Sequence, residues 1–218
     1  MILTKNPQDK ALSERIGQVA YSVQKEHLKT CAVLMANAFH DDPSIRYLLG
    51  GKTTGKNDWR YFLVLLKALY GSCYMLSSDE TIRNLLILFP PALKSVPALR
   101  FFASGGIRLW RWFKAGLYTR SLAYESNCRR VKNEILTENA YYCMCFAVRR
   151  DMQGCGLGSQ LIKPVLRILD DCRMPLYLET HKKINVRIYE KLGFALADTC
   201  LIPGTDTPQY AMLRFPKI

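Results

Sequence analysis

The spacing of apolar residues along the chain predicts a succession of helices and strands. Within residues 25–39 the apolar side chains recur every three or four positions, which predicts an amphipathic helix that ends before Pro43. Residues 57–71 show the same period and predict a second helix. The next apolar runs are short and surround a polar turn at 77–80, so they predict two strands, the second of which is stopped by a Pro-Pro pair.

The C-terminal part of the chain alternates between strand-like and helix-like patterns. A strand–helix–strand order requires a crossover connection and at least one parallel pair of strands, whereas the last two strands are expected to pair antiparallel. The pattern therefore predicts a mixed α/β fold, and 218 residues are enough for one domain with its own core. The expected elements are strands at 140–148, 175–180, 194–201 and 208–214 and helices at 156–172 and 184–192.

Composition narrows the class of protein. Apolar residues make up 49% of the chain and charged residues 22%, as in a globular protein, and no run of apolar residues is long enough for a membrane span. The first ten residues lack the basic-then-apolar order of a secretory signal, so we expect a cytoplasmic protein. The net charge of +13 favours an anionic partner, whether a nucleic acid, a membrane surface or a phosphorylated cofactor.

Eight cysteines are scattered along the chain, and none forms a C-x-x-C pair. Cys143 and Cys145 are two residues apart, which in a regular strand places both on one face and fits neither a disulfide nor a zinc site. We expect reduced, mostly buried cysteines and no metal.

Residues 92–133 form a basic and aromatic segment in which Glu125 is the single acidic residue. Breaks near Gly105–Gly106 and Gly116 predict two or three helices. Such a composition is typical of a nucleic-acid surface, but also of amphipathic helices that bury their rings and solvate their basic faces. The basic residues are Lys94, Arg100, Arg108, Arg111, Lys114, Arg120, Arg129, Arg130 and Lys132, and the interleaved aromatic residues are Phe101, Phe102, Trp110, Trp112, Phe113, Tyr118 and Tyr124.

A glycine-rich turn follows the expected strand at 140–148, within "YYCMCFAVRRDMQGCGLGSQL" (141–161). Glycine tolerates positive φ and lets the backbone approach a ligand closely, and the free NH groups at a helix N-terminus favour a phosphate. A P-loop requires a lysine after its last glycine, and the dinucleotide fingerprint requires a third glycine in the region of Ile162; both are absent.

The turn and the sequence after it carry a family pattern. Gln153, Gly156 and Gly158 match Q/R-x-x-G-x-G/A between a strand and a helix, and with "LYLETHKKINVRIYEKLGF" (176–194) the chain resembles the GNAT superfamily of N-acetyltransferases. The stretches "ANAFHDDP", "LLILFPP", "LGSQLIKPVL" and "QYAMLR" resemble its puromycin N-acetyltransferase-like branch. The resemblance implies a single domain over 1–218: a largely antiparallel sheet with a central, splayed parallel pair, helices on both faces, and a basic helical insertion at 92–133.

The resemblance also implies where the co-substrate acetyl-CoA binds. Its pantetheine is expected on the backbone of one strand segment, and its pyrophosphate on the NH groups of the glycine turn, which suits a polyanion on physical grounds as well. Asn185 precedes Tyr189 by four residues, whereas many superfamily members place the two residues seven apart, although both separations keep them on similar helix faces. The expected cofactor-binding residues are Phe146, Ala147, Val148, Gln153, Gly154, Cys155, Gly156, Leu157, Gly158, Ser159 and Asn185.

Two residues are expected to carry the chemistry. Tyr189 matches the family tyrosine that protonates the departing thiolate; the alternative is a core aromatic residue with a hydrogen-bonded hydroxyl. Glu179 ends its strand and is the candidate general base for the amine, directly or through water, and a capping or ion-pairing role is the alternative. The three histidines lie too far apart along the chain to define a triad.

The expected acceptor is a primary amine of a small molecule or peptide, and the branch resemblance suggests a xenobiotic amine. A polycationic acceptor is a poor match for so basic a chain. The alternative hypothesis is an inactive GNAT-like module that binds nucleic acid through residues 94–132, against which the intact turn, Glu179 and Tyr189 argue. A monomer and a homodimer are both compatible with the sequence.

Overall fold

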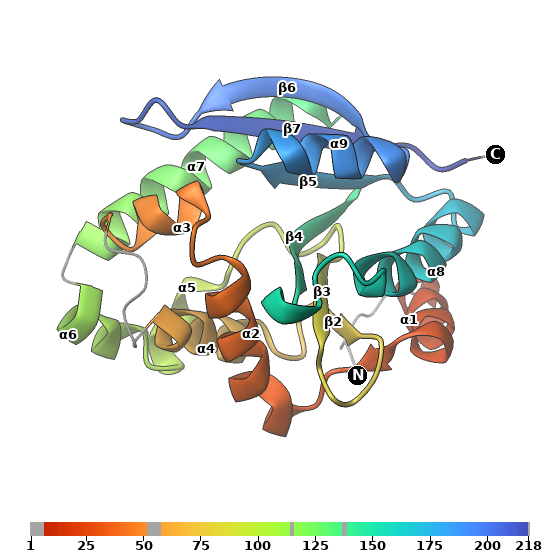
Figure 1. Ribbon diagram of the computed structural model, residues 1–218, viewed down its shortest axis with the longest axis horizontal. Coiled ribbons are helices and arrows are strands. Elements are labelled where there is room, and N and C mark those ends of the chain that lie inside the picture. Colours follow the sequence, from red (N-terminus) through yellow and green to blue (C-terminus); the bar gives the residue numbers. More distant parts are fainter. Residues whose placement is uncertain (1–6, 52–57, 114–115, 137–138, 218) are drawn as a thin grey trace.

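The computed structural model describes residues 7–51, 58–113, 116–136 and 139–217, and a seven-stranded sheet forms its centre (Figure 1). The strand order is β1-β2-β3-β4-β5-β7-β6, and the only parallel neighbours among the described strands are β4 and β5. This mixed sheet confirms the expected fold class. The strands are β1 (Tyr21–Ser22), β2 (Tyr74–Ser77), β3 (Asn84–Phe89), β4 (Tyr141–Val148), β5 (Leu176–Thr180), β6 (Ala195–Leu201) and β7 (Pro208–Arg214).

Helices cover both faces of the sheet (Figure 1). On one face, α2 and α4 pack on β2, β3 and the C-terminal half of β4. On the other face, α1 and α8 pack on β2, β3 and the beginning of β4. Helices α9 and α7 lie on opposite sides of β5 and β7. The helices are α1 (Pro7–Val19), α2 (Leu28–Ala38), α3 (Pro43–Leu48), α4 (Asp58–Leu69), α5 (Ala98–Ala103), α6 (Trp110–Phe113), α7 (Gly116–Ile135), α8 (Leu157–Asp171) and α9 (Lys183–Lys191), with short 3-10 helices at Lys25–His27, Gly106–Leu109 and Arg150–Met152.

The elements predicted from residue 25 onward are present, within a few residues of their expected bounds. The described parts of the basic segment are helical and break near Gly105–Gly106, as predicted, while the break expected near Gly116 adjoins residues 114–115, including Lys114, which lie outside the described residues. The sequence reasoning missed α1, β1 and α3. For α3 a signal was available, because Asp42 caps the helix by accepting from the Ser44 amide at 2.9 Å, with Pro43 in the first turn.

A β-bulge in β4 corrects one prediction. The pairing of β4 with β3 shifts register between Ile87 and Leu88, which leaves Met144 as an extra residue. Beyond a bulge of one residue, the side chains exchange faces. Cys143 therefore packs with α8, whereas Cys145 packs with α2 and α4, and the expectation that both share one face is wrong.

None of the helices that the structure describes has the length and apolar character required to cross a membrane.

Candidate active site

The two parallel strands separate soon after they meet. Their pairing covers only Tyr141 with Leu176 and Tyr142 with Tyr177, so beyond Tyr142 the β5 side of β4 is open. The Arg149 amide donates to the Arg83 carbonyl at 2.9 Å. Since antiparallel pairs alternate, the backbone groups of Phe146 and Val148 then turn toward the open edge, and those of Ala147 face β3. A ligand with amide groups can continue the sheet at Phe146 and Val148.

The glycine turn lies at the end of this open edge, and its three glycines serve two purposes. Gly154 and Gly156 have φ of +84° and +79°, which L side chains rarely adopt, and both are exposed. Gly158 has ordinary backbone angles, but a Cβ there would lie 3.1 Å from Cζ of Phe146, so its small size lets α8 approach β4. Because Gly156 caps α8, the NH groups of residues 157–159 have no partner within the helix.

The side chains of Gln153, Arg149 and Arg150 each contact other groups of the protein. The Gln153 side-chain amide donates to the Val148 carbonyl at 3.3 Å and so ties the turn to the strand end. Arg149 pairs with Asp151 at 2.8 Å, and Arg150 lies against His40, with a closest distance of 2.8 Å between Nη1 and Nε2. Both arginines therefore have partners in the protein.

A cavity of about 420 Å³ lies between the splayed strands and the helices of the basic segment. Five consecutive residues of β4, from Tyr142 to Phe146, line it, because the bulge turns this stretch of strand toward the cavity. The opposite walls are largely apolar and come from α2, α3, α4, α5 and α7. The wall residues of these helices include Met35, Ile45, Leu48, Phe62, Leu65, Phe101, Phe102, Tyr118 and Leu122.

Glu179 lies at the polar end of the cavity. Burial raises the pKa of its carboxyl to about 7, and the nearby hydroxyls of Tyr142 and Tyr177 and the charge of Lys132 only partly oppose this rise. Its Oε2 atom is buried and has no hydrogen-bond partner of normal geometry among the described residues. The carboxyl is thus poised to change protonation near neutral pH, with one oxygen available to a ligand.

Tyr189 also lines the cavity, from α9. Its ring packs edge-on against Phe194 with centroids 5.6 Å apart, and burial raises the pKa of the phenol above its usual range. The hydroxyl therefore stays protonated at all physiological pH values and can donate a proton. Asn185 lines the cavity too, but its amide donates to the Thr180 hydroxyl at 3.0 Å, which ties α9 to the end of β5.

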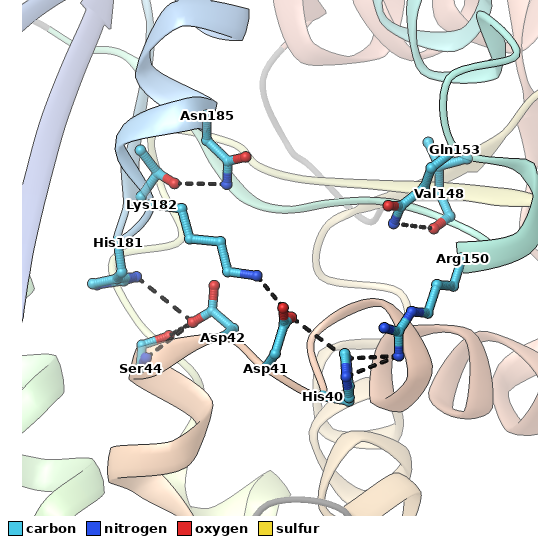
Figure 2. A network of polar contacts seen from close by, with 11 residues as sticks. His40, Asp41, Asp42, Ser44, Val148, Arg150, Gln153, His181, Lys182 and Asn185 are labelled. Atoms are coloured by element: carbon cyan, nitrogen blue, oxygen red, sulfur yellow. Dashed lines mark hydrogen bonds and ion pairs between the residues drawn. The ribbon is translucent and has the colours of Figure 1, made fainter.

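The structure adds a polar group that the sequence reasoning missed (Figure 2). His181 is buried between two cavity residues, with Nδ1 3.9 Å from Asp42 Oδ1 and Nε2 3.1 Å from the Tyr124 hydroxyl. Burial lowers the pKa of the His181 imidazole, which favours the neutral ring. These residues come from three distant parts of the chain, and only the position of His181 two residues after Glu179 hinted at a role.

The loop before α3 contacts the segments that follow both strands of the splayed pair, β4 and β5 (Figure 2). Asp41 accepts from Lys182 at 2.7 Å on the β5 side, and His40 contacts Arg150 on the β4 side. This loop, with Asp42 beside His181, joins the strand ends to the cavity wall.

A splayed parallel pair, a glycine turn on a helix N-terminus and a carboxyl–phenol pair in one cavity are the features that the resemblance to GNAT acyltransferases led us to expect. Residues 115–194 match the family model of the acetyltransferase (GNAT) family. The match covers little more than a third of the chain, and together with the curated acetyltransferases that the chain resembles it identifies an acetyl-CoA-dependent N-acetyltransferase.

Individual relatives are distant. An uncharacterized N-acetyltransferase of Schizosaccharomyces pombe is 22% identical, over 91% of this chain and 83% of its own. A mycothiol acetyltransferase of Streptomyces coelicolor is 40% identical over 63 residues, which cover 28% of this chain and 20% of that protein.

Solved structures support the fold. One described as histone acetyltransferase HPA2 and related acetyltransferase, from Corynebacterium glutamicum, has a TM-score of 0.60 at 14% identity and covers 92% of this chain and 97% of its own. A Drosophila melanogaster polyamine N-acetyltransferase has a TM-score of 0.57 at 13% identity, with coverages of 90% and 99%. At these identities the likeness bears on the fold alone.

Proposed function

We propose that the protein transfers an acetyl group from acetyl-CoA directly to the primary amine of a small molecule or peptide with an apolar body. The observation that carries this proposal is the convergence of Glu179 and Tyr189 on one largely apolar cavity beside the open edge of β4. Residues 1–218 act as a single domain in this proposal, and the basic segment 92–133 is an insertion that supplies part of the acceptor wall.

Acetyl-CoA is proposed to bind along the open edge and the turn. Phe146 and Val148 pair with the pantetheine amides, and Ala147 holds the spacing between them through its pairing with Leu85. The pyrophosphate lies on the NH groups from Gly154 to Ser159, at the N-terminus of α8. Gln153 braces the turn, and Asn185 fixes the end of β5 beside the thioester.

The chemistry requires a neutral amine, a polarised carbonyl and a protonated leaving group. Glu179, ionised above its pKa of about 7, accepts a proton from the acceptor ammonium or, through water, from the attacking amine. The amine nitrogen forms the new C–N bond, the C–S bond breaks, and the sulfur receives a proton from the Tyr189 phenol. The acylated nitrogen gives up its excess proton to solvent or to Glu179, and solvent returns a proton to Tyr189, so that the products are the neutral amide and the free thiol. Backbone NH groups of β4 around Phe146–Val148, where the strand splays from β5, are proposed to stabilise the oxyanion.

The cavity favours one apolar amine over a polyamine. Its acidic lining residues, Asp42, Glu125 and Glu179, are offset by Lys94, Arg129 and Lys132, so the site offers no net negative lining for several positive charges. A polyamine is the acceptor class named for the Drosophila structure, whereas here the lining fits the xenobiotic amines of the puromycin N-acetyltransferase-like branch.

The proposal is tested by acetyl-CoA turnover, read as free-thiol release, across benzylamine, hexylamine, puromycin, an alanyl dipeptide and spermidine. We expect kcat/KM for the best apolar amine to exceed that for spermidine at least tenfold. Spermidine as the best acceptor would overturn the assignment of acceptor class. Absence of thiol release with every amine, from protein that binds acetyl-CoA, would overturn the proposed reaction on these acceptors.

A further inference from the structure

The helices of the basic segment expose an unusual number of large apolar side chains. Six of the thirteen exposed large hydrophobic residues in the described chain lie between residues 99 and 122. Leu99 is 88% exposed, Ile107 70% and Trp110 61%. Together we name them the apolar surface, which consists of Leu99, Phe102, Ile107, Trp110, Trp112 and Leu122.

This exposure belongs to an ordered arrangement. Leu109 and Leu117 anchor the segment in the core, and the Tyr118 hydroxyl donates to the Gly106 carbonyl at 2.7 Å. Gly106 is required there, because a Cβ would lie 2.7 Å from the Phe101 ring. The protein thus holds its apolar surface outward on elements whose other sides are packed.

Positive charge dominates around the apolar surface, and Glu125, one turn from Leu122 on α7, is paired with Arg129 at 3.5 Å. No Asp or Glu occurs between Glu80 and Glu125. Arg108 and Arg111 are exposed and form no ion pair with a described residue. Arg100, also exposed, donates to the Tyr70 carbonyl at 2.6 Å and keeps its charge unneutralised.

We infer that the apolar surface docks on an anionic lipid bilayer. Trp, Phe and Leu side chains set among arginines are the composition of interfacial helices, where the rings and aliphatic groups enter the headgroup region and the cations meet anionic lipids. A second copy of the chain would bring arginines against arginines. Single-stranded nucleic acid uses aromatic rings and cations but has no use for exposed Leu99, Ile107 and Leu122.

The apolar surface is continuous with the proposed acceptor cavity. Phe102 and Leu122 belong to the surface and also line the cavity. Docking therefore places a cavity wall at the lipid boundary, where apolar amines concentrate. The docking itself depends on surface residues alone and does not rest on the proposed reaction.

The test uses the full chain in a Trp59→Phe background, which leaves Trp110 and Trp112 as the tryptophan reporters. Vesicles of phosphatidylcholine with about 30% phosphatidylserine are compared with phosphatidylcholine alone, by co-sedimentation and by quenching with brominated acyl chains. We expect at least tenfold stronger partitioning to the anionic vesicles, weakened by salt, and quenching of tryptophan fluorescence by the brominated lipids.

Two double variants separate the contribution of the arginines from that of the apolar side chains, and each variant has a matched control. Arg108→Glu with Arg111→Glu should weaken binding about 30-fold, while Lys183→Glu with Arg187→Glu, exposed on α9, should change it less than threefold. Ile107→Ser with Leu122→Ser should weaken binding at least tenfold, while Leu196→Ser with Leu201→Ser, exposed on β6, should not.

Equal, weak binding to both vesicle types would overturn the inference. It would also fail if RNA bound more tightly than anionic vesicles and depended on Arg108 and Arg111 but not on Ile107. A dimer in sedimentation that the Ile107→Ser and Leu122→Ser changes abolish, without vesicle binding, would assign the apolar surface to self-association instead.

Discussion

The donor side and the acceptor side of the cavity are built by different means. On the donor side, β4, the glycine turn and α8 are contiguous in sequence, and the groups proposed to hold acetyl-CoA are mostly backbone NH and C=O. On the acceptor side, the walls are side chains from five helices spread over residues 28–135. Backbone recognition demands specific φ angles and glycines, whereas a side-chain wall tolerates any apolar residue of suitable volume.

The two sides meet at Glu179 and Tyr189, where the difference has chemical consequences. Burial raises the pKa of both groups, so the packing around this meeting point tunes the acid and the base that are proposed to act at the donor's thioester. Variants that affect one side alone, or only the meeting point, test this division.

The largest effect is expected at the meeting point. Glu179→Gln keeps the shape of the side chain but removes the base, so kcat should fall about 1000-fold with acetyl-CoA affinity unchanged. In the wild type, kcat should decline below pH of about 7 as Glu179 is protonated, and this limb should be absent from the variant. Stopped-flow thiol release over pH 5.5–9 measures both. A variant that retains the limb would remove Glu179 from the role of base.

The next effect is confined to the donor side. Gly156→Glu places a side chain at φ of +79° and a negative charge at the α8 N-terminus, so acetyl-CoA affinity should fall about 100-fold by isothermal titration. Gly204→Glu is the matched control, since Gly204 has φ of +71° and open space in an exposed turn. Equal losses in the two variants would show a general charge effect and not a phosphate site.

The strand, turn and helix of the proposed donor side were predicted from the sequence for a physical reason. A strand, a turn with glycines at fixed spacing and a helix are local features, so Gly154, Gly156 and Gly158 could be interpreted without knowing the fold. Pro43 was taken only as a limit on the preceding helix, although Pro also favours the first turn of a helix, so α3 was missed.

The acceptor side could not be predicted in the same way. The contacts of His181 with Asp42 and Tyr124 join three segments far apart in the chain, and no periodicity reveals such a meeting. The bulge at Met144 was hidden because apolar residues occupy both faces of β4, so the alternation gave no sign of a register shift.

A stability measurement examines the cost of burying the base. With a folded-state pKa of about 7 against an ordinary 4.5, Glu179 is protonated in the native state and ionised in the unfolded state between these values, so stability falls as pH rises through this window. Allowing for water in the cavity, Glu179→Gln should raise the free energy of unfolding by about 2 kcal/mol at pH 8. The gain should vanish near pH 4. Urea unfolding at the two pH values measures it, and a loss of stability at pH 8 would contradict a destabilising buried carboxylate.

A smaller effect is expected from the acid, because a thiolate leaves without much assistance. Tyr189→Phe keeps the packing against Phe194 and removes only the hydroxyl, so kcat should fall about 30-fold while acetyl-CoA affinity changes less than twofold. Tyr210→Phe, on β7 and outside the cavity lining, should leave kcat unchanged. Equal turnover in the wild type and Tyr189→Phe would leave the phenol with a packing role alone.

The smallest effect isolates the acceptor wall. Ile45 lies half-buried on α3 and lines the cavity, so Ile45→Ala removes apolar contact with the body of the amine and should lower kcat/KM for an apolar acceptor about tenfold. Acetyl-CoA affinity should not change, because no group proposed to hold the cofactor belongs to α3. Ile184 is exposed on α9 and lies outside the cavity lining, so Ile184→Ala removes the same atoms and should leave kcat/KM unchanged. If Ile45→Ala instead weakened acetyl-CoA binding and left the acceptor's KM intact, the cavity beneath α3 would belong to the donor, and the division between the two sides would have to be redrawn.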